Sequence, residues 1–317
     1  MSVVTIIIVN YNGMKFLEGC LISLQNQTYR NLEVIIVDND STDGSLKFIK
    51  ENYPHLRLIE NRENLGFCRG NNQGFHIANG DYLMPLNSDA FLSQSYIQKL
   101  VEVMEMNQRI GIVTGKILFV RKVGNKNVIN STGHIIQKNR VPIDRGREEV
   151  DQGQYNRRES VFGVTAVAPL YRRKMLDDIQ IDGEYFDESF FSYFEDVDLC
   201  WRSRLLGWDC VYTPDAVAYH YGGRSGLSKT REMEVHLYKN RYLLLIKNCL
   251  ITNLIKDFFY IMEKEIRNIA HVLLFSPHLL KACFRIIALL PASLKKRREI
   301  MRRRKTSAQE MRRWYQK

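Results

Sequence analysis

The 317-residue sequence lacks the glycine-rich signatures of the commonest nucleotide sites and the paired cysteines of metal or disulfide frameworks. No G-x-G-x-x-G follows the first apolar run and no G-x-x-x-x-G-K-S/T occurs, which disfavours a Rossmann dinucleotide site and a P-loop. The six cysteines are scattered without a C-x-x-C pair, so we expect isolated reduced thiols. The N-terminal stretch MSVVTIIIVNYNG has no basic region and no small-residue cleavage site, which favours a buried strand over a signal peptide.

Acidic residues are scarce toward the C-terminus, and this scarcity accounts for the whole net charge of +11. Residues 281–317 contain thirteen Lys and Arg but only two Glu, with the basic residues in runs such as KKRR (295–298) and RRRK (302–305). The rest of the chain has equal numbers of basic and acidic side chains. Because the excess is confined to one segment, we expect that segment to meet an anionic partner.

Two hydrophobic periods alternate over the first hundred residues. Strands covered on both faces are predicted near 3–9, 32–37, 56–59 and 82–86, with helical spacing between them. Strands that alternate with helices predict an α/β fold, with a mostly parallel, Rossmann-like central sheet flanked by helices. Further strands are predicted over residues 161–171 and 209–213, whereas the polar residues 121–160 predict a variable loop region with room for a short hairpin.

Polar side chains follow three of the predicted strands. Asn10 ends the first, Asp38 follows the second, and Asn87-Ser88-Asp89 follows the fourth. Because ligands of open α/β sheets bind outside the carboxyl ends of the strands, these residues predict one crevice. Asp38 is suitably placed to read a ribose or base, and Asp89 to hold a divalent cation against a diphosphate. From spacing alone, each is equally well explained as a turn or helix-cap carboxylate.

Three acids stand among aromatic residues in FFSYFEDVDLCWRSRLLGW (190–208). Glu195, Asp196 and Asp198 begin a helix predicted to end at Gly207. One explanation is structural, since acids stabilise a helix N-terminus and the i,i+4 spacing pairs Asp198 with Arg202. The crowding of carboxylates against aromatic rings also predicts a functional site.

Seven ordered motifs run from Val4 to about Ser225, and together they resemble family 2 glycosyltransferases of the GT-A fold. The likeness is greatest to bacterial rhamnosyltransferase-type members that build O-antigen, capsule or other cell-wall glycans. The matching stretches are VTIIIVNYNG (4–13), FLEGCLISLQNQTY (16–29), VIIVDNDSTDGS (34–45), NLGFCRGNNQG (64–74), GDYLMPLNSDA (80–90), FFSYFEDVDLCWRSRLLGW (190–208) and HYGGRS (220–225).

The resemblance implies a role for each matching residue. Asp196 matches the acid of the family's ED pair and would be the catalytic base. Asp89 matches the last aspartate of the DxD motif and would bind Mg²⁺ or Mn²⁺ together with His220, while the other histidines are expected to be structural or on the surface. The residues expected to bind or border the substrate are Asn10, Asp38, Asn64, Gly66, Arg69, Asn72, Asn87, Glu195 and Arg224.

One position departs from the family's pattern. Asn87 stands where DxD has its first aspartate, and an amide oxygen is a neutral, weaker cation ligand. Related rhamnosyltransferase-like sequences often carry Asn there, so we do not interpret it as inactivation. The strength of metal binding and the choice between Mg²⁺ and Mn²⁺ stay open.

The implied reaction moves a sugar from a nucleoside diphosphate to an acceptor hydroxyl. One base and no second nucleophile predict a single in-line displacement, and hence inversion at the anomeric carbon. By similarity the leading donor is dTDP-rhamnose, with UDP-glucose, UDP-galactose and UDP-GlcNAc left open. The implied acceptor is a glycan or a polyprenyl-diphosphate-linked glycan of cell-surface polysaccharide synthesis.

The predicted catalytic domain covers residues 1–225, with a nucleotide-sugar half over about 1–115 and an acceptor half over about 116–225. A helical, basic extension follows over 226–317. Its apolar part, 269–294, is interrupted by prolines and charges, which favours amphipathic helices in a membrane interface over a spanning helix. We therefore expect a peripheral location at the cytoplasmic face of the cell membrane, with a solvated tail or packing helices as the alternative.

Three competing interpretations remain. A non-catalytic protein that binds nucleic acid or a membrane through its basic tail is one, but nucleic acid is not expected because the basic residues gather in one tail and the crevice is acidic. A sugar-nucleotide pyrophosphorylase would need a basic, glycine-rich loop after the first strand, where the chain has NYNG. A catalytically silent homologue would leave Asp196 without effect on rate.

Overall fold

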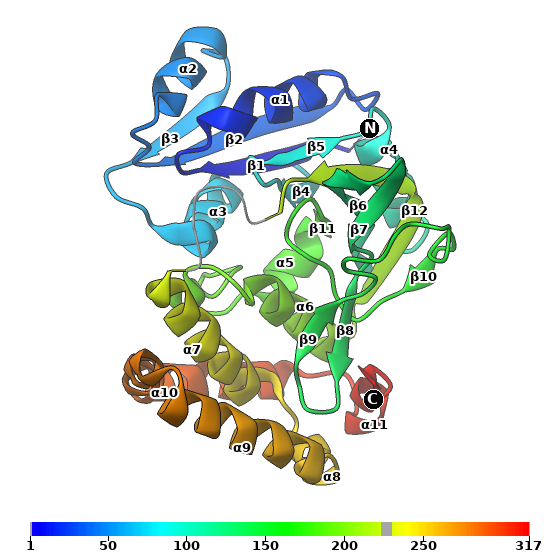
Figure 1. The fold of residues 1–317 in the computed structure, drawn as a ribbon. Coiled ribbons are helices and arrows are strands. Elements are labelled where there is room, and N and C mark those ends of the chain that lie inside the picture. The colour runs from blue at the N-terminus through cyan, green and yellow to red at the C-terminus, as the bar shows by residue number, and fades with distance from the viewer. Residues whose placement is uncertain (1, 223–229, 317) are drawn as a thin grey trace.

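The computed structural model describes residues 2–222 and 230–316. It confirms an α/β architecture with a large, mostly parallel central sheet (Figure 1). The sheet has ten strands in the order β10-β12-β6-β11-β4-β1-β2-β3, with β5 paired to β12 and β7 to β6. The strands are β1 (Val4–Asn10), β2 (Leu32–Asn39), β3 (Arg57–Asn61), β4 (Tyr82–Pro85), β5 (Ala90–Leu92), β6 (Ile110–Val123), β7 (Lys126–Ser131), β10 (Glu159–Ser160), β11 (Leu170–Arg172) and β12 (Asp209–His220).

The N-terminal half is the parallel part that the alternating pattern predicts. β1 pairs in parallel with both β2 and β4, in a register that sets Asn10 beside Asp38. Side chains of β1 alternate between two cores: Ile6 and Ile8 pack with α1 and α4, and Ile7 packs with α3 on the other face. The helices of this half are α1 (Met14–Gln25), α2 (Ser45–Asn52), α3 (Gly66–Ile77) and α4 (Tyr96–Glu105).

The acceptor half differs from the prediction at three places. Residues 121–160 are not a loop region, because β6 extends into them and β7, β8 (His134–Gln137) and β9 (Pro142–Asp144) follow as hairpins. Of the run 161–171, only its end forms a strand, β11; the rest is buried but irregular. β12 continues to His220, because β6 and β5 pair with it along that length.

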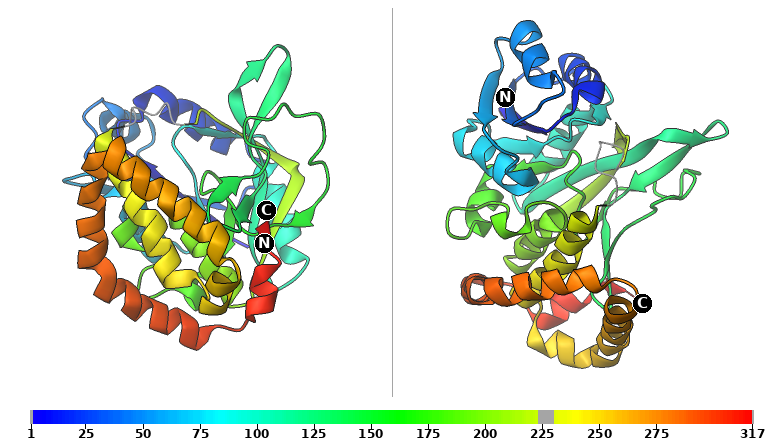
Figure 2. Two further views of the ribbon diagram at one scale, coloured as in Figure 1. Left: turned by 60° about the horizontal axis from the view of Figure 1, so that its bottom comes forward. Right: turned by 60° about the vertical axis from the view of Figure 1, so that its left-hand side comes forward.

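The C-terminal helices gather at the end of the molecule opposite α1 and α2 (Figures 1 and 2). The predicted helical extension begins with a long helix, α7, which packs against α6 and α10. The chain then returns to the catalytic part, since β13 pairs in parallel with β8 to form a three-stranded sheet β13-β8-β9. The remaining elements are α5 (Arg173–Ile179), η1 (Glu188–Phe190), α6 (Glu195–Leu205), α7 (Arg231–Asn248), α8 (Ile251–Lys256), α9 (Phe258–Leu274), η2 (Pro277–Leu279), α10 (Leu280–Arg303), α11 (Ala308–Arg312) and β13 (Tyr315–Gln316).

Candidate active site

A cavity of about 420 Å³ lies between the two halves of the catalytic part. Asn87, just beyond β4, and His220, at the end of β12, line it from one side. Glu195 and Asp196, at the start of α6, line it from the other. Asn87 of the NSD turn and the ED pair, far apart in sequence, therefore share one cavity, whereas Asp89 is not among the described residues that line it.

Asp89 is buried and contacts His220. Its Oδ1 is 3.2 Å from His220 Nε2, and its Oδ2 is buried with no hydrogen-bond partner among the described residues. Asn87 Nδ2 is 3.4 Å from the same His220 nitrogen. Among residues 2–222 and 230–316, no group of three His, Cys, Asp or Glu could hold a metal ion. The donor set nevertheless fits a cation that takes some ligands from a bound diphosphate, as Mg²⁺ commonly does, and the unpartnered carboxylate oxygen is the observation that favours it.

The turn before α6 holds an unusual backbone. Phe191, Tyr193 and Phe194 all have positive φ, between 67° and 72°, a region that bulky residues rarely occupy. The side-chain amide of Asn240, from α7, donates to the carbonyl oxygens of Phe190, Ser192 and Tyr193 at 2.8–3.0 Å. One amide from the C-terminal helices thus holds the turn that aims the ED pair at the cavity, and backbone of this kind is found at functional sites.

Asp196 is held by both its oxygens. Oδ1 accepts from its neighbour Val197 N at 2.8 Å, and Oδ2 accepts from Ala166 N at 3.2 Å. His134 Nε2 stands 3.8 Å from Oδ2. Burial raises the pKa of Asp196 above its ordinary value, although the charge of His134 acts in the opposite direction. The result is a carboxylate of increased basicity facing a cavity.

Glu195, one residue earlier, has a different environment. Burial raises its pKa well above the ordinary value, and the neighbouring charge of Asp196 raises it further. Its Oε2 has no hydrogen-bond partner among the described residues. When adjacent carboxyls differ in this way, the one with the more elevated pKa is the proton donor and the other the base. We therefore assign the neutral form to Glu195 and the charged form to Asp196.

His134 lines the cavity although sequence reasoning passed over it. It begins β8, and its Nε2 is 3.4 Å from Asp144 Oδ1 at the end of β9. Burial lowers the pKa of His134, but the hydrogen bond to Asp144 and the charge of Asp196 outweigh burial and raise it. The signal in the sequence was weak, because only the β8–β9 hairpin, inside a segment predicted as loop, brings these residues together.

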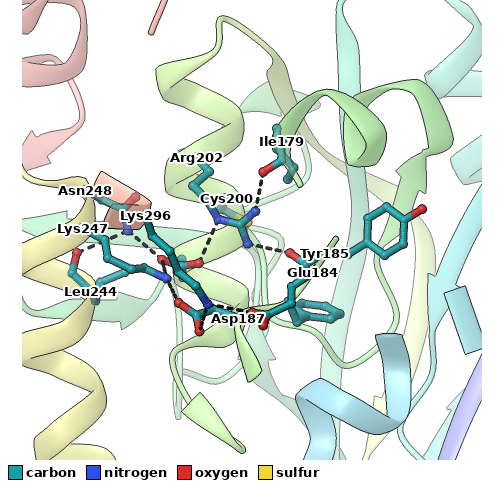
Figure 3. Close-up of polar contacts among 12 residues, drawn as sticks. Ile179, Glu184, Tyr185, Asp187, Cys200, Arg202, Leu244, Lys247, Asn248 and Lys296 are labelled. Atoms are coloured by element: carbon teal, nitrogen blue, oxygen red, sulfur yellow. Dashed lines mark hydrogen bonds and ion pairs between the residues drawn. The ribbon is translucent and has the colours of Figure 1, made fainter. Parts of the chain in front are cut away.

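A buried ion network anchors α6 from behind (Figure 3). Asp198 pairs with Arg202 at 2.9 Å, as the i,i+4 spacing predicts, and with Lys247 of α7 at 2.8 Å. Lys247 also pairs with Asp187, and Asp187 forms a second ion pair, with Lys296 of α10, at 2.8 Å. The C-terminal helices are therefore part of the support of the candidate catalytic helix.

Asn10 is the last residue of β1, and Asp38 lies beside it near the end of β2. Asn10 Nδ2 donates to Asp38 Oδ1 at 2.8 Å, and Ser41 N donates to Asp38 Oδ2 at 3.0 Å. Both side chains are fully buried. In this structure Asp38 therefore organises its turn, and its contact with a base or ribose stays a prediction.

The residues expected from the NLGFCRGNNQG motif connect the two halves. Gly66 has a φ of +79°, and a Cβ there would lie 2.7 Å from Phe191 O, so only glycine fits. Asn72 is buried and exchanges hydrogen bonds with the backbone of Phe186. Asn64 accepts from Gly66 N, and the half-exposed Arg69 lies 3.8 Å from Glu188. None of these four is among the described residues that line the cavity, and Arg224 lies outside the described residues.

Comparisons with known proteins find glycosyltransferases by both sequence and fold. An uncharacterized glycosyltransferase of Haemophilus influenzae is 33% identical over 110 residues, which cover 34% of each chain, so the match spans about a third of that relative. An N-acetylglucosaminyl-diphospho-decaprenol L-rhamnosyltransferase of Mycobacterium tuberculosis is 26% identical over 77% of this chain and 84% of its own. The crystal structure of GalNAc-T7 with UDP, GalNAc and Mn²⁺ has a similar fold, with a TM-score of 0.61 at 14% identity over 78% of this chain and 48% of that one.

The family model for glycosyl transferase family 2 matches residues 5–180, which is more than half of the chain. The match includes the turns after β1, β2 and β4, and the ED pair follows it on α6. This chain belongs to glycosyl transferase family 2.

Proposed function

We propose that this chain is an inverting, metal-dependent glycosyltransferase of cell-surface glycan synthesis. The preferred donor is dTDP-rhamnose, and the acceptor is a hydroxyl of a polyprenyl-diphosphate-linked glycan or a polysaccharide. One observation carries the proposal: Asn87 of the NSD turn, His220 and the acid Asp196 line a single cavity, with Asp89 buried beside His220. The similarity to a rhamnosyltransferase of a diphospho-decaprenol acceptor supports the choice of donor and acceptor, over 84% of that relative's length.

Asp196 is the proposed general base. As the acceptor oxygen forms its bond to the anomeric carbon, its proton passes to Asp196, and the bond to the diphosphate oxygen breaks. Burial and the raised pKa make this carboxylate a better base than an exposed one. Aromatic and apolar side chains, including Phe67, Phe194 and Met233, line the same cavity.

Asp89, His220 and Asn87 are the proposed cation site at the donor end. A divalent cation bound there would neutralise the charge that develops on the departing diphosphate. The unpartnered Oδ2 of Asp89 supplies an anionic ligand, and Asn87 adds a neutral one. Replacing Asp89 with Asn would remove the anionic ligand, so divalent-dependent stabilisation of the protein by dTDP or UDP should be lost.

A panel of sugar nucleotides tests the donor. The chain is mixed with each nucleotide sugar, with and without Mg²⁺ or Mn²⁺, and its unfolding temperature is measured, since a bound ligand raises stability by mass action. We expect the largest metal-dependent rise with dTDP-rhamnose, followed by product formation with a polyprenyl-diphosphate-linked acceptor. A larger rise with UDP-glucose, UDP-galactose or UDP-GlcNAc would replace the donor but keep the reaction class. No response to any sugar nucleotide would contradict the proposal.

A further inference from the structure

The C-terminal helices expose an apolar surface that nothing in the described structure covers. Among the described residues, twenty-two large apolar side chains are exposed, and sixteen of them lie between residues 251 and 294, on α8, α9, α10 and their links. Phe259 and Phe284 are 84% and 73% exposed. Single exposed apolar residues are common on proteins, but contiguous groups of this size mark an interaction site.

The exposed residues follow helical stripes. On α9 they recur at Phe259, Met262, Ile266, Ile269 and Leu273, a spacing of three and four that keeps them on one face. On α10 a similar stripe, in which Pro291 takes one position, begins with exposed apolar residues and ends with exposed arginines: Leu280, Phe284, Ile287, Leu294, Arg298 and Arg302. One helix face thus passes from apolar to cationic, as in helices that lie in a membrane interface.

The helix Pro277–Arg303 is long and apolar enough to cross a membrane, yet polar contacts join both its ends to the rest of the protein. Near its start, Lys281 and Arg285 pair with Glu232 of α7. Toward its end, Lys296 pairs with the buried Asp187, and Arg303 donates to the backbone of Gln180. A spanning orientation would break all of these contacts, so the helix is suited to lie along a surface.

We propose that the exposed face of α8, α9 and α10 docks in the plane of an anionic lipid bilayer, with the apolar stripes at the acyl boundary and the basic end of α10 at the head groups. Charge decides between this partner and a second copy of the chain. Arg298 and Arg304 have no ion-pair partner among the described residues, so a symmetric dimer through this face would bring like charges together. Anionic head groups attract them instead, and each basic residue near such a surface adds to binding.

Docking would bring the chain to a lipid-linked acceptor. The relevance of docking to catalysis therefore rests on the proposed function. Met233 and Leu237 of α7 line the cavity, and α7 packs against α10 over much of its length. The same helix therefore contacts the membrane-facing layer on one side and the candidate active site on the other. An acceptor carried by a membrane-embedded lipid would reach Asp196 from this side, at the cytoplasmic face where nucleotide sugars are available.

Vesicle flotation of the full chain tests the docking. The vesicles are phosphatidylcholine alone or phosphatidylcholine mixed with phosphatidylglycerol. We expect binding to the mixed vesicles, about tenfold or more weaker binding for Phe259→Glu/Phe284→Glu, and a smaller loss for Arg298→Gln/Arg304→Gln. Matched controls are Met106→Glu/Val123→Glu, also exposed but on other elements, and Lys122→Gln/Lys126→Gln; both should bind like wild type.

Three results would overturn docking in the plane. The first is binding by Phe259→Glu/Phe284→Glu at the wild-type level with an unchanged circular dichroism spectrum. The second is resistance of the membrane-bound chain to alkaline carbonate extraction, which would indicate a spanning helix. The third is a stable dimer, detected by light scattering in the absence of lipid, that the substitutions Phe259→Glu/Phe284→Glu convert to a monomer. Because flotation needs no donor or acceptor, Asp196→Asn should float like wild type, and the proposed function can fail independently.

Discussion

Glu195 and Asp196 are adjacent carboxyls with different charge states. Their difference comes from what surrounds each of them: Asp196 has two backbone donors and His134 nearby, whereas Glu195 has an oxygen unpartnered among the described residues and a like charge beside it. The resemblance to the ED motif names Asp196 as the base, but the motif does not contain His134, because the hairpin that supplies this residue lies far from both acids in the sequence. The surroundings of the two acids therefore support Asp196 as the proposed base independently of the motif.

Conservative amides at these two positions should separate the roles. Asp196→Asn removes the base and should lower kcat by roughly 10²–10⁴-fold, the range of general-base catalysis. Glu195→Gln copies the neutral carboxyl and should leave kcat within about tenfold of wild type, because burial already disfavours its charged form. Steady-state transfer assays with equal Tm as the folding control would measure both. Equal losses in the two variants would refute the division of labour.

His134 should act on the pH dependence of the reaction, since it lowers the pKa of Asp196 while burial raises it. Without the imidazolium, the carboxylate stays protonated to a higher pH. His134→Gln is therefore expected to move the acidic limb of the kcat/KM profile toward higher pH, with activity largely regained in alkaline buffer. A merely structural residue would lower the whole profile without moving the limb, and a variant of an exposed histidine, His55→Gln, serves as the comparison.

Of the residues that the motifs single out, the structure brings Asn87, His220, Glu195 and Asp196 to one cavity, and their roles stay predictions. The motifs could not distinguish residues that contact a ligand from residues that only support the fold. Asn72 and Gly66 lie where two chain segments pack together, which explains their place in the motif. Asp38 already accepts a hydrogen bond from Asn10. Whether a polar side chain is free or already satisfied depends on contacts distant in sequence, which a motif does not contain.

At the scale of elements, the start of α6 depends on α7 for its shape. Three residues with positive φ precede it, and the side-chain amide of Asn240 holds this turn by donating to three of its carbonyl oxygens. Asn240→Ala should relax this turn and lower kcat by about tenfold or more, since small misplacements of a catalytic group are costly. Asn268→Ala, on the same C-terminal region but outside the turn, should have little effect; a transfer assay compares the two.

Lys247 tests the anchoring of α6 by the C-terminal helices. Lys247→Met would leave Asp187 and Asp198 buried without their shared cation, at a cost of about 3–5 kcal/mol in the free energy of unfolding. Lys295→Ala is the matched control, because its pair with Asp182 is 71% and 46% exposed and should contribute less than about 1 kcal/mol. Urea unfolding measures both values. Similar costs for the two variants would contradict the anchoring role.

Elements with strong periodicity were predictable, and those defined by their partners were not. β1, β2 and α6 carry clear patterns and lie close to where the pattern puts them. The run 161–171 is apolar because it is buried, but only three residues at its end, β11, find pairing partners in β4 and β6. β12 shows the converse, since two partner strands extend it well past its apolar part.

For the whole molecule, acid should release the C-terminal helices from the catalytic part. Burial raises the pKa of Asp187, but Lys247 and Lys296 outweigh burial and hold it well below its ordinary value. A depressed folded pKa stabilises the fold above the unfolded pKa of about 3.9, and this stability is lost as pH falls below it. Tm is therefore expected to fall steeply below about pH 4, and in Lys247→Met the pH dependence should be shallower. A parallel loss in both proteins would exclude the network as its source.

The pairing of β13 with β8 has a consequence for the order of folding. Tyr315 and Gln316 lie beside Ile136 and Gln137, so the sheet whose first residue is His134 takes one outer strand from a segment that follows all the C-terminal helices. The partners of β1, β2 and β4 are nearer in sequence, and contacts between near segments form faster than contacts between distant ones. The hairpin that carries His134 is therefore expected to become fully ordered only after the N-terminal strands have paired.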